Sequence, residues 1–129
     1  MLHKDLTQQV INAAKAVHAE LGPGLPHNFY REAMELELRE QGLAAVIDRP
    51  VKVHYKGHSL GELGVDFVVN DAIACVMVDA EEISPDEYGK ARTLLKGLDL
   101  DVGLLLKFNG GRLDVRRVEA VPKKQAAAS

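Results

Sequence analysis

The most constraining feature of the sequence is a run without a single polar side chain, Ala-Ile-Ala-Cys-Val-Met-Val at residues 72–78. Because successive side chains of a strand point to opposite faces, a strand of this composition must be covered on both sides. A second, largely apolar run spans residues 102–108. The segment between the two runs is long enough for a crossover between parallel strands. Together they predict an α/β fold, a mixed sheet with helices on its faces.

Helical periodicity marks three segments. Apolar residues recur at three- and four-residue steps over residues 5–21 and again from about 28 to 41, with Asp5 and Asn28 as the expected N-terminal caps. A Ser-Pro pair followed by acidic residues opens a third helix at about 84–97.

The remaining segments read as strands. Period-two alternation predicts a half-buried strand from Pro50 to residue 55, and residues 60–69 predict a second strand. Asn70-Asp71 turns the chain into the apolar run. After the hairpin signal Asn109-Gly110-Gly111, residues 113–118 predict an outer strand. The expected order of elements is therefore ααβββαββ.

The bulk properties of the chain exclude several classes of protein. Its 129 residues fit one domain, which we expect at residues 1–121, followed by a short disordered tail at 122–129. A net charge of −3 provides no global attraction to nucleic acid or to an anionic membrane. Neither a membrane span nor a secretory signal is visible, so a cytoplasmic location is expected. The single cysteine, Cys75, lies inside the apolar run and is expected to be buried and reduced.

Spaced motifs along most of the chain carry a family resemblance. They are Val-His-Ala-Glu-Leu-Gly-Pro-Gly-Leu at residues 17–25, Val-x-Tyr-Lys-Gly at 53–57, the strand acid Asp66, and Val-Gly-Leu-Leu-Leu-Lys-Phe-Asn at 102–109. This pattern resembles the GxxExxY family, a branch of the PD-(D/E)xK restriction-endonuclease-like superfamily. The resemblance covers about residues 5–118 and implies a restriction-endonuclease-like core.

The chain departs from the motif that names that family. Gly24 and Tyr30 stand at the expected spacing, but His27 replaces the glutamate between them. The glutamine that the family carries on the helix after its catalytic strand falls at about Lys90.

The departure is larger at the catalytic motif. In the nucleases that the chain resembles, an aspartate and a glutamate hold Mg²⁺ or Mn²⁺, and a lysine two residues after the glutamate assists the attacking water. Here Asp66 remains, but Val76 and Val78 replace the glutamate and the lysine. Valine offers neither a metal ligand nor a proton donor, and loss of an acid–base group alone costs about 10²- to 10⁴-fold in rate. We therefore expect no bound cofactor and little or no catalysis.

Some residues leave a functional and a structural interpretation open. Asp66 is either a surviving metal ligand or a hydrogen-bonded structural acid, and His27 is either a replacement ligand or a surface or cap residue. Lys90 is either a relocated catalytic lysine or a solvated helix residue, and Asp79 either a displaced acid or part of an acidic loop. We favour the structural interpretation for all four.

A local cluster of cations lies near the C-terminal end of the chain. Arg112, Arg116 and Arg117 could contact phosphates, although few aromatic residues accompany them for base stacking. A solvated edge strand, which its charges protect from aggregation, is the favoured interpretation.

Three hypotheses of function follow. The first is a catalytically inactive nuclease-fold domain that serves as a binding or regulatory module. The second is a nuclease dependent on Mg²⁺ or Mn²⁺, with relocated residues that include Asp66 and Lys90. The third is a self-associating structural domain. A protein partner or a second copy of the chain is compatible with the sequence, and nucleic acid is not indicated by the net charge.

Overall fold

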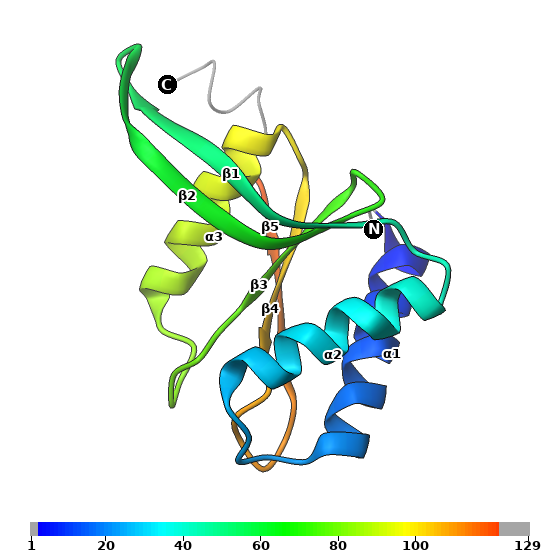
Figure 1. The fold of residues 1–129 in the computed structure, drawn as a ribbon. Coiled ribbons are helices and arrows are strands. Elements are labelled where there is room, and N and C mark those ends of the chain that lie inside the picture. The colour runs from blue at the N-terminus through cyan, green and yellow to red at the C-terminus, as the bar shows by residue number, and fades with distance from the viewer. Residues whose placement is uncertain (1–2, 122–129) are drawn as a thin grey trace.

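Helices cover both faces of a five-stranded mixed sheet in the computed structural model, which describes residues 3–121 (Figure 1). The elements are α1 (Lys4–Leu21), α2 (His27–Glu40), β1 (Ala45–Tyr55), β2 (His58–Val69), β3 (Ile73–Met77), α3 (Pro85–Leu98), β4 (Val102–Lys107) and β5 (Asp114–Glu119). Their order confirms the predicted ααβββαββ arrangement. The predicted tail at 122–129 lies outside the described residues.

The sheet follows the order of the chain, β1-β2-β3-β4-β5. β3 and β4 pair in parallel, from Ile73 opposite Val102 to Met77 opposite Leu106, while the other neighbours are antiparallel. α3 forms the connection between the two parallel strands, as the length of that segment predicted. β1 and β5 are the edges, and the β1–β2 hairpin extends beyond the sheet as a long twisted arm (Figure 1).

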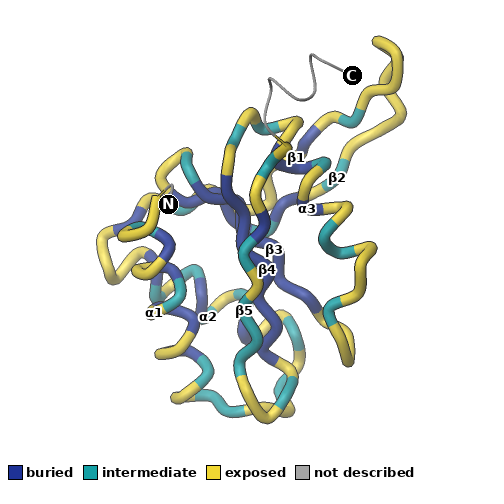
Figure 2. Tube along the Cα trace, turned by 180° about the vertical axis from the view of Figure 1, so that it is seen from behind, coloured by how far each residue is buried: buried dark blue, intermediate teal, exposed yellow. Residues whose placement is uncertain are grey.

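Two apolar clusters divide the core at the sheet. Cys75 and Met77 of β3 pack with residues of α1 and α2, whereas Ala74 and Val76 pack with residues of α3. β3 is buried along its whole length, and Figure 2 shows it with β4 at the centre of the molecule. The prediction of a strand covered on both faces is confirmed. In residues 3–121 we find no helix with the length and apolar character that a membrane crossing requires.

Three local predictions are wrong. Asp5 and Asn28 do not cap their helices: α1 begins at Lys4 after His3, α2 begins at His27 after Pro26, and neither start has a side-chain cap hydrogen bond. The extended backbone of Pro26 already sets the direction in which α2 begins. β1 starts at Ala45 rather than Pro50, because residues 45–49 pair with the end of β2 although they do not alternate in polarity. At Asp48 the backbone has a left-handed φ of 52°, which interrupts the regular strand conformation of this segment.

The buried thiol of Cys75 gives a test of the core. Burial, with a smaller contribution from the charge of Asp66, raises the pKa of this thiol from 9.0 to about 12. The Cys75 thiol of the folded protein therefore keeps its proton. The stabilisation that comes from this raised pKa is complete below about pH 9 and is lost as the pH rises towards 12. We expect no reaction of Cys75 with a disulfide reagent at pH 8 until denaturant unfolds the protein. A Ser59→Cys, Cys75→Ala variant, with its thiol on the exposed arm, should react at once. Equally rapid labelling of native Cys75 would contradict the buried position.

Candidate functional site

Asp66 lies at the point where the pairing of β2 with β3 ends. The backbone register joins Phe67 to Cys75, Val68 to Ala74 and Val69 to Ile73. Beyond that register the N–H of Met77 donates to Oδ2 of Asp66 at 2.8 Å. The carboxylate thus accepts a hydrogen bond from β3 that a backbone carbonyl would otherwise accept.

The second oxygen of Asp66 is held by α2. Nε of Arg31 donates to Oδ1 of Asp66 at 2.9 Å, and another nitrogen of the same guanidinium donates to Asp48 of β1. The guanidinium also lies 5.9 Å from the centre of the Phe67 ring. Partial burial opposes the charge of Arg31, but the hydrogen bonds to Asp48 and Asp66 outweigh it and raise the pKa of the guanidinium. Asp66 is therefore an ion-paired acid with a partner on each oxygen.

The two valines expected at the positions of the catalytic motif lie in the core. Val76 is 4% exposed and Val78 is 3% exposed. Both belong to the apolar cluster that contains Ala91, Leu94 and Leu95 of α3. Asp66 is thus held from the side of α2, whereas Val76 of β3 and Val78, which directly follows β3, pack with residues of α3.

Gly24 and Tyr30, two of the residues on which the resemblance to the GxxExxY motif rests, stabilise the loop between α1 and α2. The hydroxyl of Tyr30 donates to the carbonyl of Gly22 and accepts from the N–H of Leu25, so this buried ring fixes the turn between α1 and α2. Its ring stacks on Phe108 at 5.4 Å. Gly24 in the same turn has a left-handed φ of 98°, which favours glycine. His27 is the first residue of α2 and is half-buried, one turn before Arg31.

The relocated ligands of the second hypothesis are not assembled. Within residues 3–121, no three or more His, Cys, Asp or Glu side chains are grouped so that they could hold a metal ion. Asp79 follows β3 and accepts a hydrogen bond from Nδ2 of Asn109 at 3.4 Å, and Lys90 is an exposed residue of α3. A divalent cation requires several oxygen ligands around one point, so the donor set around Asp66 does not fit one.

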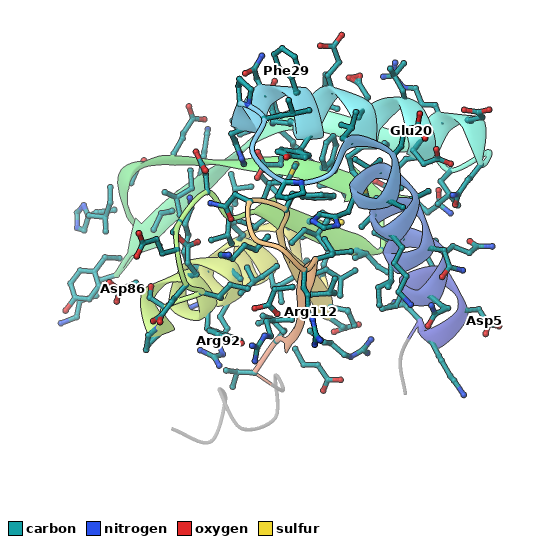
Figure 3. The ribbon with its side chains drawn as sticks, turned by 90° about the horizontal axis from the view of Figure 1, so that it is seen from below. Asp5, Glu20, Phe29, Asp86, Arg92 and Arg112 are labelled. Atoms are coloured by element: carbon teal, nitrogen blue, oxygen red, sulfur yellow. The ribbon has the colours of Figure 1, made fainter. Side chains whose placement is uncertain are left out.

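Two of the three predicted phosphate-binding arginines are paired with acids of their own strand. Arg116 donates to Asp114 at 2.7 Å and Arg117 donates to Glu119 at 3.1 Å. The hydrogen bond from Arg116 lowers the pKa of the Asp114 carboxyl. Arg112 is exposed in the hairpin between β4 and β5 (Figure 3). The positive charge of this edge is therefore largely balanced locally.

The hypothesis of self-association concerns exposed apolar side chains, and α2 carries two. Phe29 and Leu36 are 51% and 62% exposed, and Phe29 projects from α2 away from the sheet (Figure 3). Single exposed apolar residues are ordinary on monomeric proteins, so self-association stays a hypothesis.

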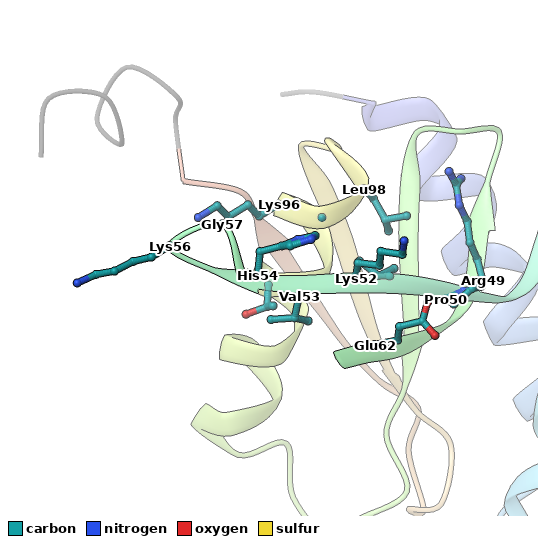
Figure 4. A pocket seen from close by; sticks show the side chains of 13 residues that line it. Arg49, Pro50, Lys52, Val53, His54, Lys56, Gly57, Glu62, Lys96 and Leu98 are labelled. Atoms are coloured by element: carbon teal, nitrogen blue, oxygen red, sulfur yellow. The ribbon is translucent and has the colours of Figure 1, made fainter. Parts of the chain in front are cut away.

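Sequence reasoning missed a groove between the hairpin arm and α3, with a volume of about 880 Å³ (Figure 4). Its charged lining residues are Arg49, Lys52, Lys56, Lys96 and Glu62. The available signal was the sequence of Lys52 and His54 on β1, followed by Lys56 in the turn. The contribution of Lys96 was not visible, because the fold brings it from a separate helix.

Comparison with known proteins agrees with this architecture. An alkaline exonuclease (LHK-Exo) from Laribacter hongkongensis has a similar structure, with a TM-score of 0.54 and 11% sequence identity. The match covers 74% of this chain and 57% of the exonuclease, so the chain spans little more than half the length of that protein. The curated proteins contain no match to the sequence. The family model of the PD-(D/E)XK nuclease superfamily matches residues 4–118, and the chain therefore belongs to that superfamily.

Proposed function

We propose that this domain has lost the nuclease reaction and persists as a binding or regulatory module, descended from the GxxExxY branch of the superfamily. One observation carries the proposal: both oxygens of Asp66 already have partners, Oδ1 the guanidinium of Arg31 and Oδ2 the N–H of Met77. A fixed organic cation thus neutralises the acid that a metal ion would need. A guanidinium cannot lower the pKa of a water molecule by direct coordination as a divalent metal does.

The surroundings of Asp66 support the same conclusion. A Mg²⁺ site uses at least one or two carboxylates, waters and substrate phosphates. Val76 and Val78 supply no ligand and are enclosed by α3. At the two valine positions themselves, a hydrated dication could bind only if the apolar contacts of both valines with α3 were broken, which would cost several kcal/mol. Loss of an acid–base group alone costs about 10²- to 10⁴-fold in rate, so we expect little turnover where metal ligands are missing as well.

A cleavage assay tests the proposal. The purified chain is incubated with single- and double-stranded DNA and RNA in Mg²⁺ and in Mn²⁺, beside an active nuclease of the same fold. We expect no products above those of the buffer. Turnover that co-elutes with the protein and disappears in Asp66→Asn would overturn the proposal.

A second measurement is independent of activity. The electron paramagnetic resonance signal of free Mn²⁺ falls when a protein binds the ion. We expect the signal to be the same with the wild-type chain and with Asp66→Asn. A stoichiometric loss of signal with the wild type alone would show a metal site at Asp66.

A further inference from the structure

The groove between the hairpin arm and α3 concentrates positive charge in an acidic protein. Arg49, Lys52 and Lys56 come from the arm and Lys96 comes from α3, and Glu62 is the one carboxylate among the described lining residues. The chain as a whole has a net charge of −3. A concave surface that is mostly of one sign focuses the electrostatic potential, so this groove attracts anions although the whole protein does not.

Most of these cations have no acidic partner. Arg49 forms one ion pair, with Asp71 at 3.9 Å. In the part of the chain that the structure describes, Lys52, Lys56 and Lys96 take part in no ion pair. The charges of the three lysines are therefore available to an anionic ligand.

The groove is built into the fold by a glycine. Val51 of β1 is 2% exposed and packs against α3 at Gly97, where a Cβ would overlap its Cγ1. The missing side chain lets the arm approach the end of α3 closely, and this contact places Lys96 beside the residues of the arm (Figure 4).

The shape of the groove suits an extended chain. One wall is formed by the arm at residues 49–57, and the other by the last part of α3 at residues 93–98. At about 3.3 Å per residue, the wall on the arm is roughly 20 Å long, which is the length of an extended peptide of about seven residues. The volume of about 880 Å³ far exceeds the space that a single inorganic anion needs.

The lining offers apolar contacts but no aromatic platform. Val53 and Leu98 are half-buried members of the lining, and no Phe, Tyr or Trp is found among its described residues. Nucleobases are bound by stacking on aromatic rings, whereas the aliphatic side chains of a peptide can pack on valine and leucine. The combination of cations and aliphatic side chains therefore matches an acidic peptide.

The edge of β1 does not favour an added strand. The carbonyl of Lys52 would lie 3.4 Å from a Cβ at Gly97, so α3 covers this part of the backbone edge. Pro50 has no N–H to donate to another strand. A peptide in this groove is therefore held by its side chains, and its carboxylates supply most of the attraction.

We propose that this groove binds an acidic segment of a partner protein in an extended conformation, with its carboxylates on Arg49, Lys52, Lys56 and Lys96. The proposal rests on the binding function proposed above and names the chemistry of the partner and the place where it binds. It involves none of the positions of the catalytic motif.

The test measures the binding of fluorescein-labelled octaglutamate by fluorescence anisotropy at low salt, with EDTA present so that no metal ion contributes. The variant Lys52→Glu, Lys96→Glu reverses one charge on each wall of the groove. The control Lys15→Glu, Arg92→Glu makes the same change of net charge at exposed residues outside the lining. We expect the groove variant to lose about 30-fold in affinity and the control to change by a few-fold at most.

A gain of affinity provides an independent readout. Glu62 lies opposite Lys52 in the register of β1 and β2 and repels an acidic ligand in the groove. Glu62→Gln should therefore tighten the binding of octaglutamate about 3-fold, whereas Glu20→Gln, at an exposed residue of α1, should change it little. A loss of structure would not produce such a gain, and circular dichroism confirms that each variant is folded.

A competition experiment separates a peptide from nucleic acid. Unlabelled oligothymidylate of about eight nucleotides has nearly the same charge as octaglutamate, so the comparison reports the chemistry of the ligand rather than its charge. We expect octaglutamate to bind more tightly. Oligothymidylate that competes equally well or better would assign the groove to nucleic acid and overturn the peptide proposal.

The other opposing outcomes are distinct. Absence of octaglutamate binding by the wild type, or equal losses in the groove variant and the control, would overturn the groove proposal and leave the proposed loss of catalysis intact. Cleavage of nucleic acid in Mg²⁺ would refute the loss of catalysis without affecting the groove.

Discussion

Val76→Glu is expected to unfold the domain or destabilise it by more than about 3 kcal/mol, and not to restore a metal site. Val76 is 4% exposed and packs with Leu94 and Leu95 of α3. A carboxylate at this position would be buried without a partner, and such a charge is among the most costly substitutions in a core. Urea unfolding followed by circular dichroism measures the loss.

Two comparisons sharpen this prediction. Val76→Thr keeps the shape of the side chain and adds only a hydroxyl, so it should cost about 1–3 kcal/mol. The double variant Val76→Glu, Val78→Lys introduces the glutamate and the lysine of the expected motif, and we expect it to show no cleavage of nucleic acid. If Mg²⁺ raised the free energy of unfolding of that double variant, the metal would be binding the folded state. That result would refute the inference that positions 76 and 78 are too enclosed by α3 to hold a metal ion.

Asp66→Ala is expected to lower the free energy of unfolding by about 3 kcal/mol, because both oxygens of this side chain have partners in the fold. The change leaves the N–H of Met77 without its acceptor and removes one of the two acids that hold Arg31. Asp66→Asn keeps an oxygen for Met77 and should cost about half as much. Chemical unfolding of the three proteins side by side provides the measurement.

The ion pair itself is measured by a double-mutant cycle. Arg31→Met and Asp66→Asn, alone and together, should show a coupling free energy of about 1–2 kcal/mol, because both side chains are less than one-third exposed. Asp48 is 66% exposed, so Asp48→Asn should cost less than about 1 kcal/mol although it contacts the same guanidinium. A coupling near zero would mean that Asp66 is held by Met77 alone.

The fold was predictable because its strongest signals are local. The apolar run that becomes β3 has no soluble alternative to burial on both faces, and α3 supplies the crossover that its length required. The start of β1 was missed because residues 45–49 carry no alternation, and their strand conformation depends on pairing with the end of β2. The cap predicted at Asn28 was wrong because α2 begins one residue earlier, directly after Pro26, whose backbone sets the direction of the helix.

The site was predictable only in part, for the same physical reason. The replacement of two motif residues by Val76 and Val78 could be read directly from the sequence. The partner of Asp66 could not, because Arg31 lies 35 residues away and no spacing pattern joins them. Lys96 likewise reaches the groove only because Gly97 admits Val51.

The hydrogen bond from Met77 to Asp66 has a consequence for how such chains evolve. An aspartate whose carboxylate accepts a backbone hydrogen bond from the neighbouring strand contributes to stability. Selection for stability alone can therefore retain it, even where no reaction depends on it. Val76 and Val78, by contrast, contribute apolar packing under α3 and make no polar contact of this kind. In this chain the presence of Asp66 is therefore no evidence of an active enzyme, because its carboxylate already has a structural role.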